Sequence, residues 1–276
     1  MINFDWSYFF LCVITTLGSL IFLSDKVKYY FKFTYFILGS MFATSWPVVF
    51  MLFRPFHWKN ALIPAWQVKK IMGLVGVKFS IRGKKNIVKD KAAVILINHQ
   101  SSLDLVVLAE LWPVIDSCTV VSKSEILYFT GIFGLASLLW GTIFINRNKK
   151  NESVNALNTT GKIINKRKAK LLMFPEGTRH SDNTLRPFKK GAFNVAISSQ
   201  APIQPIVVSK YYYIDHDKKI FNSGKSYITI LPAISTEGMT KNDLDTLMKK
   251  SYDVMNREFQ SSTNEILAEV KRENNK

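Results

Sequence analysis

The sequence predicts an α/β fold preceded by a hydrophobic helical hairpin. From Ala92 onward, short apolar runs typical of buried strands alternate with stretches whose apolar residues recur at helical spacing. Earlier in the chain, the runs from Trp6 to Leu23 and from Phe33 to Phe53 contain no charged residue, and each has about the length of a membrane helix. At 276 residues, the chain has room for one sizeable domain plus an appendage. We therefore expect an N-terminal anchor over residues 1–60, an α/β domain over 61–260 and a polar tail over 261–276.

The two uncharged N-terminal runs favour attachment to a membrane. Aromatic residues gather at their edges, as interfacial anchors do, although two buried core helices are the alternative. If both runs crossed a bilayer, the basic residues between them and those from Arg54 onward would lie on opposite sides, which the positive-inside rule disfavours. A shallow hairpin in one leaflet keeps both basic segments cytosolic. We therefore expect a hairpin that dips into the membrane rather than spanning it.

The formal net charge of +17 predicts an anionic partner. The sequence has no zinc-finger spacing, basic zipper or RNP-like stretch, so we expect no nucleic acid. With 47% hydrophobic residues, the chain fits an anionic membrane surface at least as well, and phosphorylated or CoA-linked substrates fit too. Cys12 and Cys118 have neither disulfide nor metal-ligand spacing, and the sequence shows no metal-binding cluster. The missing disulfide framework suits a domain that faces the cytosol.

A histidine and an aspartate follow the first expected core strand. Residues 92–97 form an apolar run that predicts a buried strand, and residues 105–111 have the spacing of a helix. His99 and Asp104 lie in the turn between them, where open α/β sheets place their chemistry. Histidine can take up and return a proton near neutral pH, and a carboxylate on its other ring nitrogen would fix its tautomer. The structural alternative is that Ser101 and Asp104 form the S-x-x-D pattern of a capping box.

A third long uncharged run extends from Ile126 to Ile145. Hydropathy alone would make it transmembrane, but that would put His99 and the chain after Arg147 on opposite sides of the membrane. The run also contains three glycines, and its end reads as a strand. We expect a buried helix followed by a strand.

The rest of the chain continues the alternation of helix and strand. Helices are expected over residues 152–168, over 192–199 and from Thr240, where Thr240 and Asp243 form a capping box. Strands are expected over 170–174, 202–208 and 227–231. Beyond about Ser261 the chain is polar, and we expect it to fray.

Arginines follow two of the expected strands. Arg147 comes after the strand that ends the third apolar run, and Arg179 ends the loop Pro-Glu-Gly-Thr-Arg after the strand at 170–174. The guanidinium fork matches phosphate oxygens, so both are candidate phosphate ligands. Either arginine taken alone is more often a surface or ion-pair residue, and the loop taken alone is an ordinary turn in which Gly177 can adopt a positive φ.

Taken together and in order, these segments resemble the lysophosphatidic acid acyltransferases (1-acylglycerol-3-phosphate O-acyltransferases), most closely the short membrane-bound type of animal endoplasmic reticulum. The resemblance runs from about Ile81 to Thr240. Its motifs are Asn-His-Gln-Ser-Ser-Leu-Asp at 98–104, Gly-Thr-Ile-Phe-Ile-Asn-Arg at 141–147, Phe-Pro-Glu-Gly-Thr-Arg at 174–179, Pro-Phe-Lys-Lys-Gly-Ala-Phe at 187–193 and Pro-Ile-Gln-Pro-Ile at 202–206. The resemblance implies a glycerolipid acyltransferase-like mixed sheet flanked by helices, with the third apolar run lining an acyl-chain groove.

The resemblance also implies roles for the site residues. His99 would deprotonate the sn-2 hydroxyl of lysophosphatidic acid and Asp104 would orient His99, so that acyl-CoA acylates the hydroxyl by direct transfer to give phosphatidic acid. The residues expected to bind the acceptor phosphate are Arg147, Glu176, Gly177, Thr178 and Arg179. Pro205 corresponds to a proline linked to acyl-CoA use or packing. The chain departs from the family at Asn146, where an aspartate is usual, which puts the anchoring of Arg147 in doubt.

The same resemblance implies the wider setting. Acyl-CoA would be a co-substrate, with no bound cofactor and no metal, and the protein would work on the endoplasmic reticulum membrane. Two alternatives stay open: an acyltransferase of the same fold with another acceptor, such as glycerol 3-phosphate or another lysophospholipid, and a non-catalytic basic membrane-binding protein. The sequence gives no protein partner.

Overall fold

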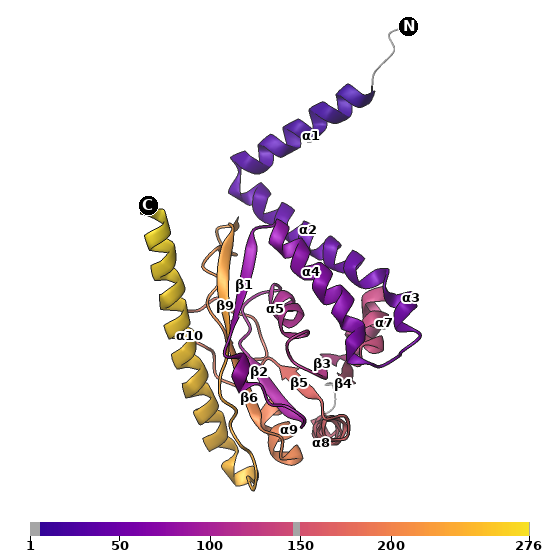
Figure 1. The fold of residues 1–276 in the computed structure, drawn as a ribbon, viewed down its shortest axis with the longest axis vertical. Helices are drawn as coiled ribbons and strands as arrows, with labels where there is room; N and C mark the ends of the chain where they lie inside the picture. The colour runs from indigo at the N-terminus through magenta and orange to yellow at the C-terminus, as the bar shows by residue number, and fades with distance from the viewer. Residues whose placement is uncertain (1–5, 146–149, 276) are drawn as a thin grey trace.

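A computed structural model describes residues 6–145 and 150–275 of the chain. Within these residues, seven strands form one sheet in the order β1-β9-β6-β2-β5-β3-β4, and helices cover both of its faces (Figure 1). The strands are β1 (Val77–Arg82), β2 (Ala93–Ile97), β3 (Cys118–Lys123), β4 (Ile143–Ile145), β5 (Lys170–Met173), β6 (Ile203–Val208) and β9 (Gly224–Ile230). Strands β6, β2, β5, β3 and β4 are parallel, whereas β9 is antiparallel to β6 and parallel to β1. The expected α/β fold with a mixed sheet flanked by helices is confirmed.

The core lies on both sides of the central strand β2. Because side chains alternate along a strand, Ile95 and Ile97 face one apolar cluster, and Val94 and Leu96 face the other. Helices α2 (Asp25–Ser45), α4 (Leu62–Leu74) and α5 (Asp104–Leu111) supply the first cluster. Helices α8 (Lys150–Arg167), α9 (Gly191–Ser199) and α10 (Leu244–Asn274) supply the second. This two-sided burial explains why β2 is apolar throughout instead of alternating with polar residues.

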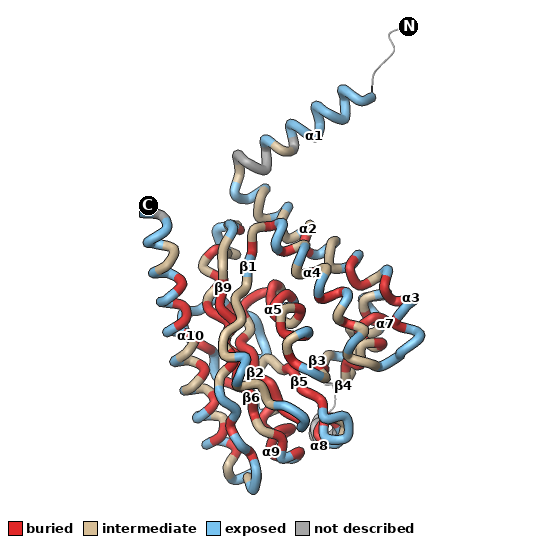
Figure 2. Tube along the Cα trace, in the orientation of Figure 1, coloured by how far each residue is buried: buried red, intermediate tan, exposed pale blue. Residues whose placement is uncertain are grey.

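The two N-terminal helices differ in their packing. Helix α1 (Trp6–Leu23) projects from the domain and is exposed along most of its described length (Figure 2). Helix α2 follows a bend at Ser24 and buries Phe36 and Ala43 in the core that also contains α4 and β2. In the described part of the chain, no helix has both the length and the apolar character needed to cross a membrane. The membrane hairpin and the division at residues 60 and 260 remain predictions.

The third uncharged run forms two short helices and a strand. Helix α6 (Ser124–Phe129) and helix α7 (Ile132–Leu139) are separated at Gly131, which has a φ of +56°, and β4 follows. Helix α7 packs through Ala136 and Leu139 against Val48 and Met51 of helix α3 (Val48–Met51). The expected order of helix and strand is confirmed, with a break in the helix at the glycine. The expected burial is only partly correct, because α6 has no buried residue and Phe129 and Ile132 are exposed.

Helix α10 extends further than the sequence suggested. Thr240 and Asp243 form the expected capping box, and the helix then continues to Asn274. Ile266 is buried, and Glu265 accepts two hydrogen bonds from Arg82, whose guanidinium stacks on the ring of Tyr227. The expectation of a frayed chain beyond about residue 261 is wrong, because this last part of the helix packs against the β1–β9 edge of the sheet.

Candidate active site

The candidate site lies where three neighbouring parallel strands end. Strands β6, β2 and β5 are adjacent in the sheet, so the loops that follow them meet at one edge. The loop after β2 contains His99, the loop after β5 contains Glu176 to Arg179, and the loop after β6 contains Tyr211. The sheet order thus gathers residues that are more than 100 positions apart in the sequence.

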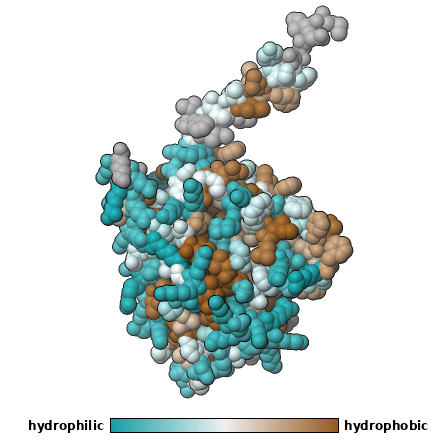
Figure 3. All heavy atoms as spheres, in the orientation of Figure 1, coloured by the Kyte–Doolittle hydropathy of each residue, from teal (hydrophilic) through white to brown (hydrophobic). Residues whose placement is uncertain are grey.

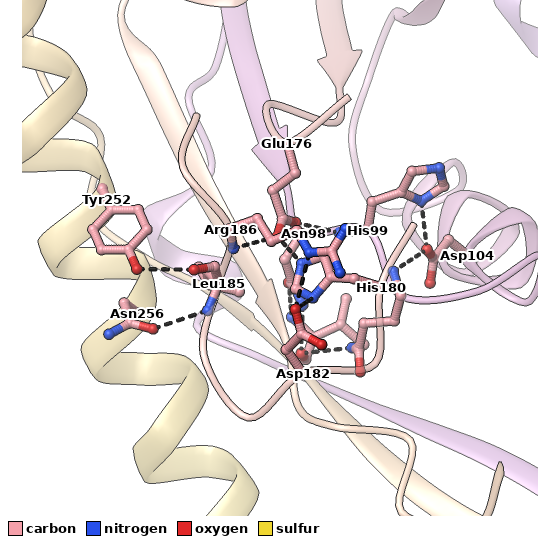
Figure 4. Close-up of polar contacts among 12 residues, drawn as sticks. Asn98, His99, Asp104, Glu176, His180, Asp182, Leu185, Arg186, Tyr252 and Asn256 are labelled. Carbon is pink, nitrogen blue, oxygen red and sulfur yellow. Dashed lines mark hydrogen bonds and ion pairs between the residues drawn. The ribbon is translucent and has the colours of Figure 1, made fainter. Parts of the chain in front are cut away.

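His99 and Asp104 form a hydrogen-bonded pair. Strand β2 ends at Ile97 and α5 begins at Asp104, and the turn between them places the His99 Nδ1 2.6 Å from Asp104 Oδ2 (Figure 4). A carboxylate only accepts hydrogen bonds, so Nδ1 carries a proton, and in the neutral ring the lone pair therefore lies on Nε2. Among the described residues, nothing hydrogen-bonds to Nε2. The ring is partly exposed and stacks on Phe174, with 4.1 Å between ring centroids. His99 is thereby oriented with one basic nitrogen available.

The Asp104 carboxylate is buried and saturated with donors. Its Oδ2 accepts hydrogen bonds from the backbone N–H groups of Gln100 and Ser101, at 2.7 and 3.0 Å, in addition to His99. Its Oδ1 accepts one from the Tyr211 hydroxyl at 2.7 Å. The pairing with His99 is therefore present, but the capping box is only half formed: Asp104 accepts from the Ser101 N–H, whereas the Ser101 hydroxyl accepts from the Leu103 N–H at 3.4 Å instead of from Asp104. The contact with Tyr211 could not be predicted from the sequence, because Tyr211 lies 107 positions after Asp104.

Glu176 holds the backbone of His99. One of its oxygens accepts a hydrogen bond from the His99 N–H at 2.7 Å, and the other accepts from the Arg186 N–H at 2.9 Å and pairs with the ring of His180 (Figure 4). The His180 N–H in turn donates to the His99 carbonyl at 3.2 Å. Glu176 is 2% exposed. This buried carboxylate is thus an anchor between two loops, and it does not point to solvent where a phosphate would bind.

The residues after Glu176 are exposed beside the pair. Gly177 has a φ of +71°, and a Cβ atom there would lie 2.7 Å from Lys189 Nζ, so only glycine fits without displacement. Thr178 and Arg179 are exposed, and the Arg179 guanidinium has no ion-pair or hydrogen-bond partner among the described residues. The charge of Arg179 also acts on the imidazole of His216. It adds to the lowering of the His216 pKa that is caused first by burial and then by the charge of Lys219.

Of the two remaining expected site residues, the structure describes only Pro205. Arg147, with the unusual Asn146 beside it, falls outside the described residues. Pro205 is buried in β6 opposite Leu96. It lies on the same face of that strand as Ile203 and Val207, which belong to the α9–α10 side of the core.

An apolar cavity of about 360 Å³ opens beside His99. Helices α4, α5 and α7 line it together with the ends of β3 and β5, and His99, Phe174 and Gly177 are part of its wall. Its apolar lining includes Ala65, Val68, Leu108, Trp112, Phe133 and Trp140. The volume and the mainly apolar lining suit a hydrocarbon chain. Besides His99, the polar side chains of the wall are the hydroxyls of Ser40, Thr44, Ser122, Ser137 and Thr142. The third uncharged run contributes Ile126, Phe133 and Trp140 to this wall, as expected.

In the described ranges, no three histidine, cysteine or acidic side chains lie together in a way that could hold a metal ion. Cys12 is exposed and Cys118 is buried, and both are free thiols.

Comparison with known proteins identifies relatives over most of the chain. A family model described as Acyltransferase matches residues 78–209. The chain is 32% identical to human 1-acyl-sn-glycerol-3-phosphate acyltransferase alpha, over 84% of this chain and 81% of that protein. It is 34% identical to human 1-acyl-sn-glycerol-3-phosphate acyltransferase beta, over 73% and 72%, respectively. It is 37% identical to 1-acyl-sn-glycerol-3-phosphate acyltransferase of Saccharomyces cerevisiae, over 69% and 62%.

A solved structure shares the fold. The crystal structure of the 1-acyl-sn-glycerophosphate (LPA) acyltransferase PlsC from Thermotoga maritima superposes with a TM-score of 0.63. The match covers 86% of this chain and 98% of that one, at 19% sequence identity. The sheet and its flanking helices therefore belong to an architecture already seen by crystallography.

Proposed function

Because the chain belongs to the family of 1-acyl-sn-glycerol-3-phosphate acyltransferases, we propose that it acylates the sn-2 hydroxyl of lysophosphatidic acid to give phosphatidic acid. The observation that supports this reaction best is the His99–Asp104 pair in the wall of an apolar cavity. Acyl transfer to a hydroxyl needs a base beside the hydroxyl and a place for a fatty chain, and this site offers both within one cavity.

In our mechanism, His99 is the general base. Its Nε2 takes the proton of the acceptor hydroxyl while Asp104 stabilises the imidazolium that forms. The alkoxide attacks the thioester carbonyl of acyl-CoA, and the new C–O bond forms as the C–S bond breaks. His99 then gives its proton to the departing thiolate, so that the products are phosphatidic acid and CoA with a free thiol. The transfer is direct, with acyl-CoA as co-substrate and no bound cofactor or metal.

The apolar cavity would hold an acyl chain. Burying a methylene group contributes about 0.8 kcal/mol, so the contacts along α4, α5 and α7 would add substantially to binding. A chain in this cavity keeps its carboxyl end near His99, which is where the reaction takes place.

The acceptor phosphate would bind to the loop after β5. Arg179 is the best-placed ligand in the described part of this loop, because its guanidinium is exposed and unpaired and the next residue, His180, is hydrogen-bonded to the His99 carbonyl. Gly177 and Thr178 would complete this part of the site, and we retain Arg147 as a further ligand from the family pattern. Glu176 would act indirectly, by holding His99 and the loop together.

The membrane would supply both substrates, lysophosphatidic acid and acyl-CoA. Large apolar side chains are exposed on α1 and around α3, where Figure 3 shows them gathered on the surface, and the net charge of +17 would attract anionic lipid. We propose that the N-terminal hairpin anchors the protein to the endoplasmic reticulum membrane with the catalytic domain in the cytosol. Glycosylation sites engineered into the connector near Lys26 test this topology, because their modification would place the connector in the lumen.

An acceptor panel tests the proposed reaction. Membranes containing the full chain and oleoyl-CoA are supplied with lysophosphatidic acid, glycerol 3-phosphate or a lysophospholipid with a larger head group. We expect CoA release and phosphatidic acid with lysophosphatidic acid, with the new acyl group at sn-2. Faster acylation of another acceptor would reassign the substrate. Absence of CoA release with every acceptor would favour a non-catalytic membrane-binding protein.

A further inference from the structure

Tyr211 contacts the His99–Asp104 pair from a distant part of the chain. It lies three residues after the end of β6, and its side chain is buried. Its hydroxyl donates to Asp104 Oδ1 at 2.7 Å, and its backbone N–H donates to the Gln100 side-chain oxygen at 3.2 Å. Gln100 also donates to the carbonyls of Val208 and Ser209, both at 3.1 Å. The loop after β6 is therefore bonded to both the carboxylate and the turn that presents His99.

The hydroxyl of Tyr211 remains a donor under physiological conditions. Burial and, after it, the charge of Asp104 raise the pKa of Tyr211 well above its ordinary value. The phenol consequently keeps its proton, and the proton has the carboxylate as its acceptor. The opposite oxygen of the same carboxylate faces His99, so Tyr211 and His99 bind Asp104 from its two ends.

We propose that Tyr211 is a positioning residue of the His99–Asp104 pair. Its hydrogen bond fixes the plane of the carboxylate so that Oδ2 faces Nδ1, and it draws negative charge toward Oδ1. Both effects change the affinity of the His99 imidazole for a proton. The catalytic consequence rests on the proposed function, whereas the effect on the imidazole does not.

A purely structural role makes a different prediction. Tyr211 packs beside Phe79 and Tyr213, and a buried tyrosine needs a hydrogen-bond partner wherever it lies. Tyr213 provides a matched control, because it is equally buried and its hydroxyl pairs with Ser226 instead of the carboxylate. If Tyr211 only fills space, Tyr211→Phe and Tyr213→Phe should affect His99 alike.

The experiment compares the full-length wild type with Tyr211→Phe and Tyr213→Phe. The protein is isotopically labelled at histidine in detergent micelles, and NMR follows the titration of the His99 imidazole, assigned with His99→Gln. The pH dependence of CoA release from oleoyl-CoA and lysophosphatidic acid is measured in parallel. Thermal melting of each variant shows that the fold is retained.

We expect the His99 titration midpoint to rise by about half a pH unit in Tyr211→Phe and to stay at the wild-type value in Tyr213→Phe, because the carboxylate loses a donor only in the first. The acidic limb of the rate profile should move with it, so that kcat falls about 3-fold at pH values below the midpoint, with an unchanged KM for the acceptor. An unmoved midpoint in Tyr211→Phe, or equal shifts in both variants, would overturn the proposal. A wild type without CoA release would contradict the proposed function, and the NMR midpoints would still decide the role of Tyr211.

Discussion

Two buried carboxylates hold His99 in complementary ways. Asp104 contacts the ring through Nδ1, and Glu176 accepts a hydrogen bond from the backbone N–H of the same residue. The first contact fixes the tautomer and the direction of Nε2, and the second fixes the backbone from which the ring projects. Every oxygen of the two carboxylates has at least one donor, which compensates for burying charge.

Removing the Glu176 carboxylate should damage catalysis rather than substrate affinity. In Glu176→Ala, the N–H groups of His99 and Arg186 and the His180 ring lose their acceptor inside the protein. Each unpaired buried donor costs about 1–3 kcal/mol, so we expect a loss of about 3 kcal/mol in the free energy of unfolding. Steady-state kinetics should show a lower kcat with a nearly unchanged KM for lysophosphatidic acid. A raised KM with normal kcat and normal stability would instead support direct contact between Glu176 and the phosphate.

Arg179→Ala should have the opposite kinetic signature. A charge-assisted bidentate contact with phosphate contributes about 1.5–3 kcal/mol, so we expect the KM for lysophosphatidic acid to rise about 10- to 100-fold while kcat changes little. Arg257→Ala is the matched control, because Arg257 is an exposed arginine on α10, across the sheet from the cavity. A wild-type KM in Arg179→Ala would refute the phosphate assignment.

At the scale of residues, the sequence predicts hydrogen bonds between residues of one loop but not those between loops that follow different strands. The pairing of His99 with Asp104 follows from a strand-to-helix turn of five residues, so it could be predicted. Glu176 lies 77 positions from the residue it holds, and Tyr211 lies 107 positions from Asp104. Such contacts depend on the order of β6, β2 and β5 in the sheet, which a single sequence does not specify.

At the scale of elements, α4, α5 and α7 act together as the wall of the cavity. Helix α7 contributes because the uncharged run breaks at Gly131, after which the helix packs against α3. The small side chains Ala65 and Ala109 leave the space between α4 and α5 open. The cavity therefore depends on small residues at particular helix positions.

Filling the cavity should shorten the acyl chain that the enzyme accepts. Ala65→Leu introduces three carbon atoms into the wall, which we expect to displace about two methylene groups of a long chain. At about 0.8 kcal/mol each, kcat/KM for oleoyl-CoA should fall about 10-fold relative to that for a short-chain acyl-CoA. Ile63→Leu, an exposed position on the same helix, should leave the preference unchanged. An unaltered chain-length preference in Ala65→Leu would exclude this cavity as the acyl-chain site.

Element types were easier to predict than element ends or neighbours. The strands β2, β5 and β6 and the helices α5 and α9 follow from apolar runs and helical spacing within a few residues. The end of α10 was missed because the composition beyond residue 261 is polar, while its stability comes from Ile266 and from the pairing of Glu265 with Arg82 on β1. The composition of this segment does not reveal that a strand far away in the sequence provides a surface on which the helix can pack.

At the scale of the whole molecule, exposed apolar side chains lie on α1 and on the N-terminal part of the domain that contains the site. Phe53 and Phe129 are more than 80% exposed, Trp66 on α4 is also exposed, and α1 projects from the domain with exposed aromatic side chains. Helix α2 connects these two regions and is itself part of the core. A lipid surface bound by these residues would lie close to the elements that line the cavity.

Deleting residues 1–23 should separate membrane binding from folding. The described side chains of α1 are largely exposed, so its removal should leave thermal stability nearly unchanged while co-flotation with anionic vesicles falls severalfold. Deleting residues 1–45 is the comparison, because it also removes Phe36 and Ala43 from the core and should unfold the domain. Undiminished flotation of the first deletion would show that α1 is not an anchor.

The most direct test of the account is the rate of CoA release with and without the His99 imidazole. Membranes that carry equal amounts of wild type, His99→Ala or the control His57→Ala are supplied with oleoyl-CoA and lysophosphatidic acid. His57 is partly exposed, its ring accepts a hydrogen bond from the Lys59 N–H, and it does not line the cavity. The loss of a positioned general base should lower the rate about 10²- to 10⁴-fold in His99→Ala, with membrane binding and thermal stability retained, whereas His57→Ala should resemble the wild type. Equal CoA release by His99→Ala and the wild type would contradict the assignment of His99 as the base.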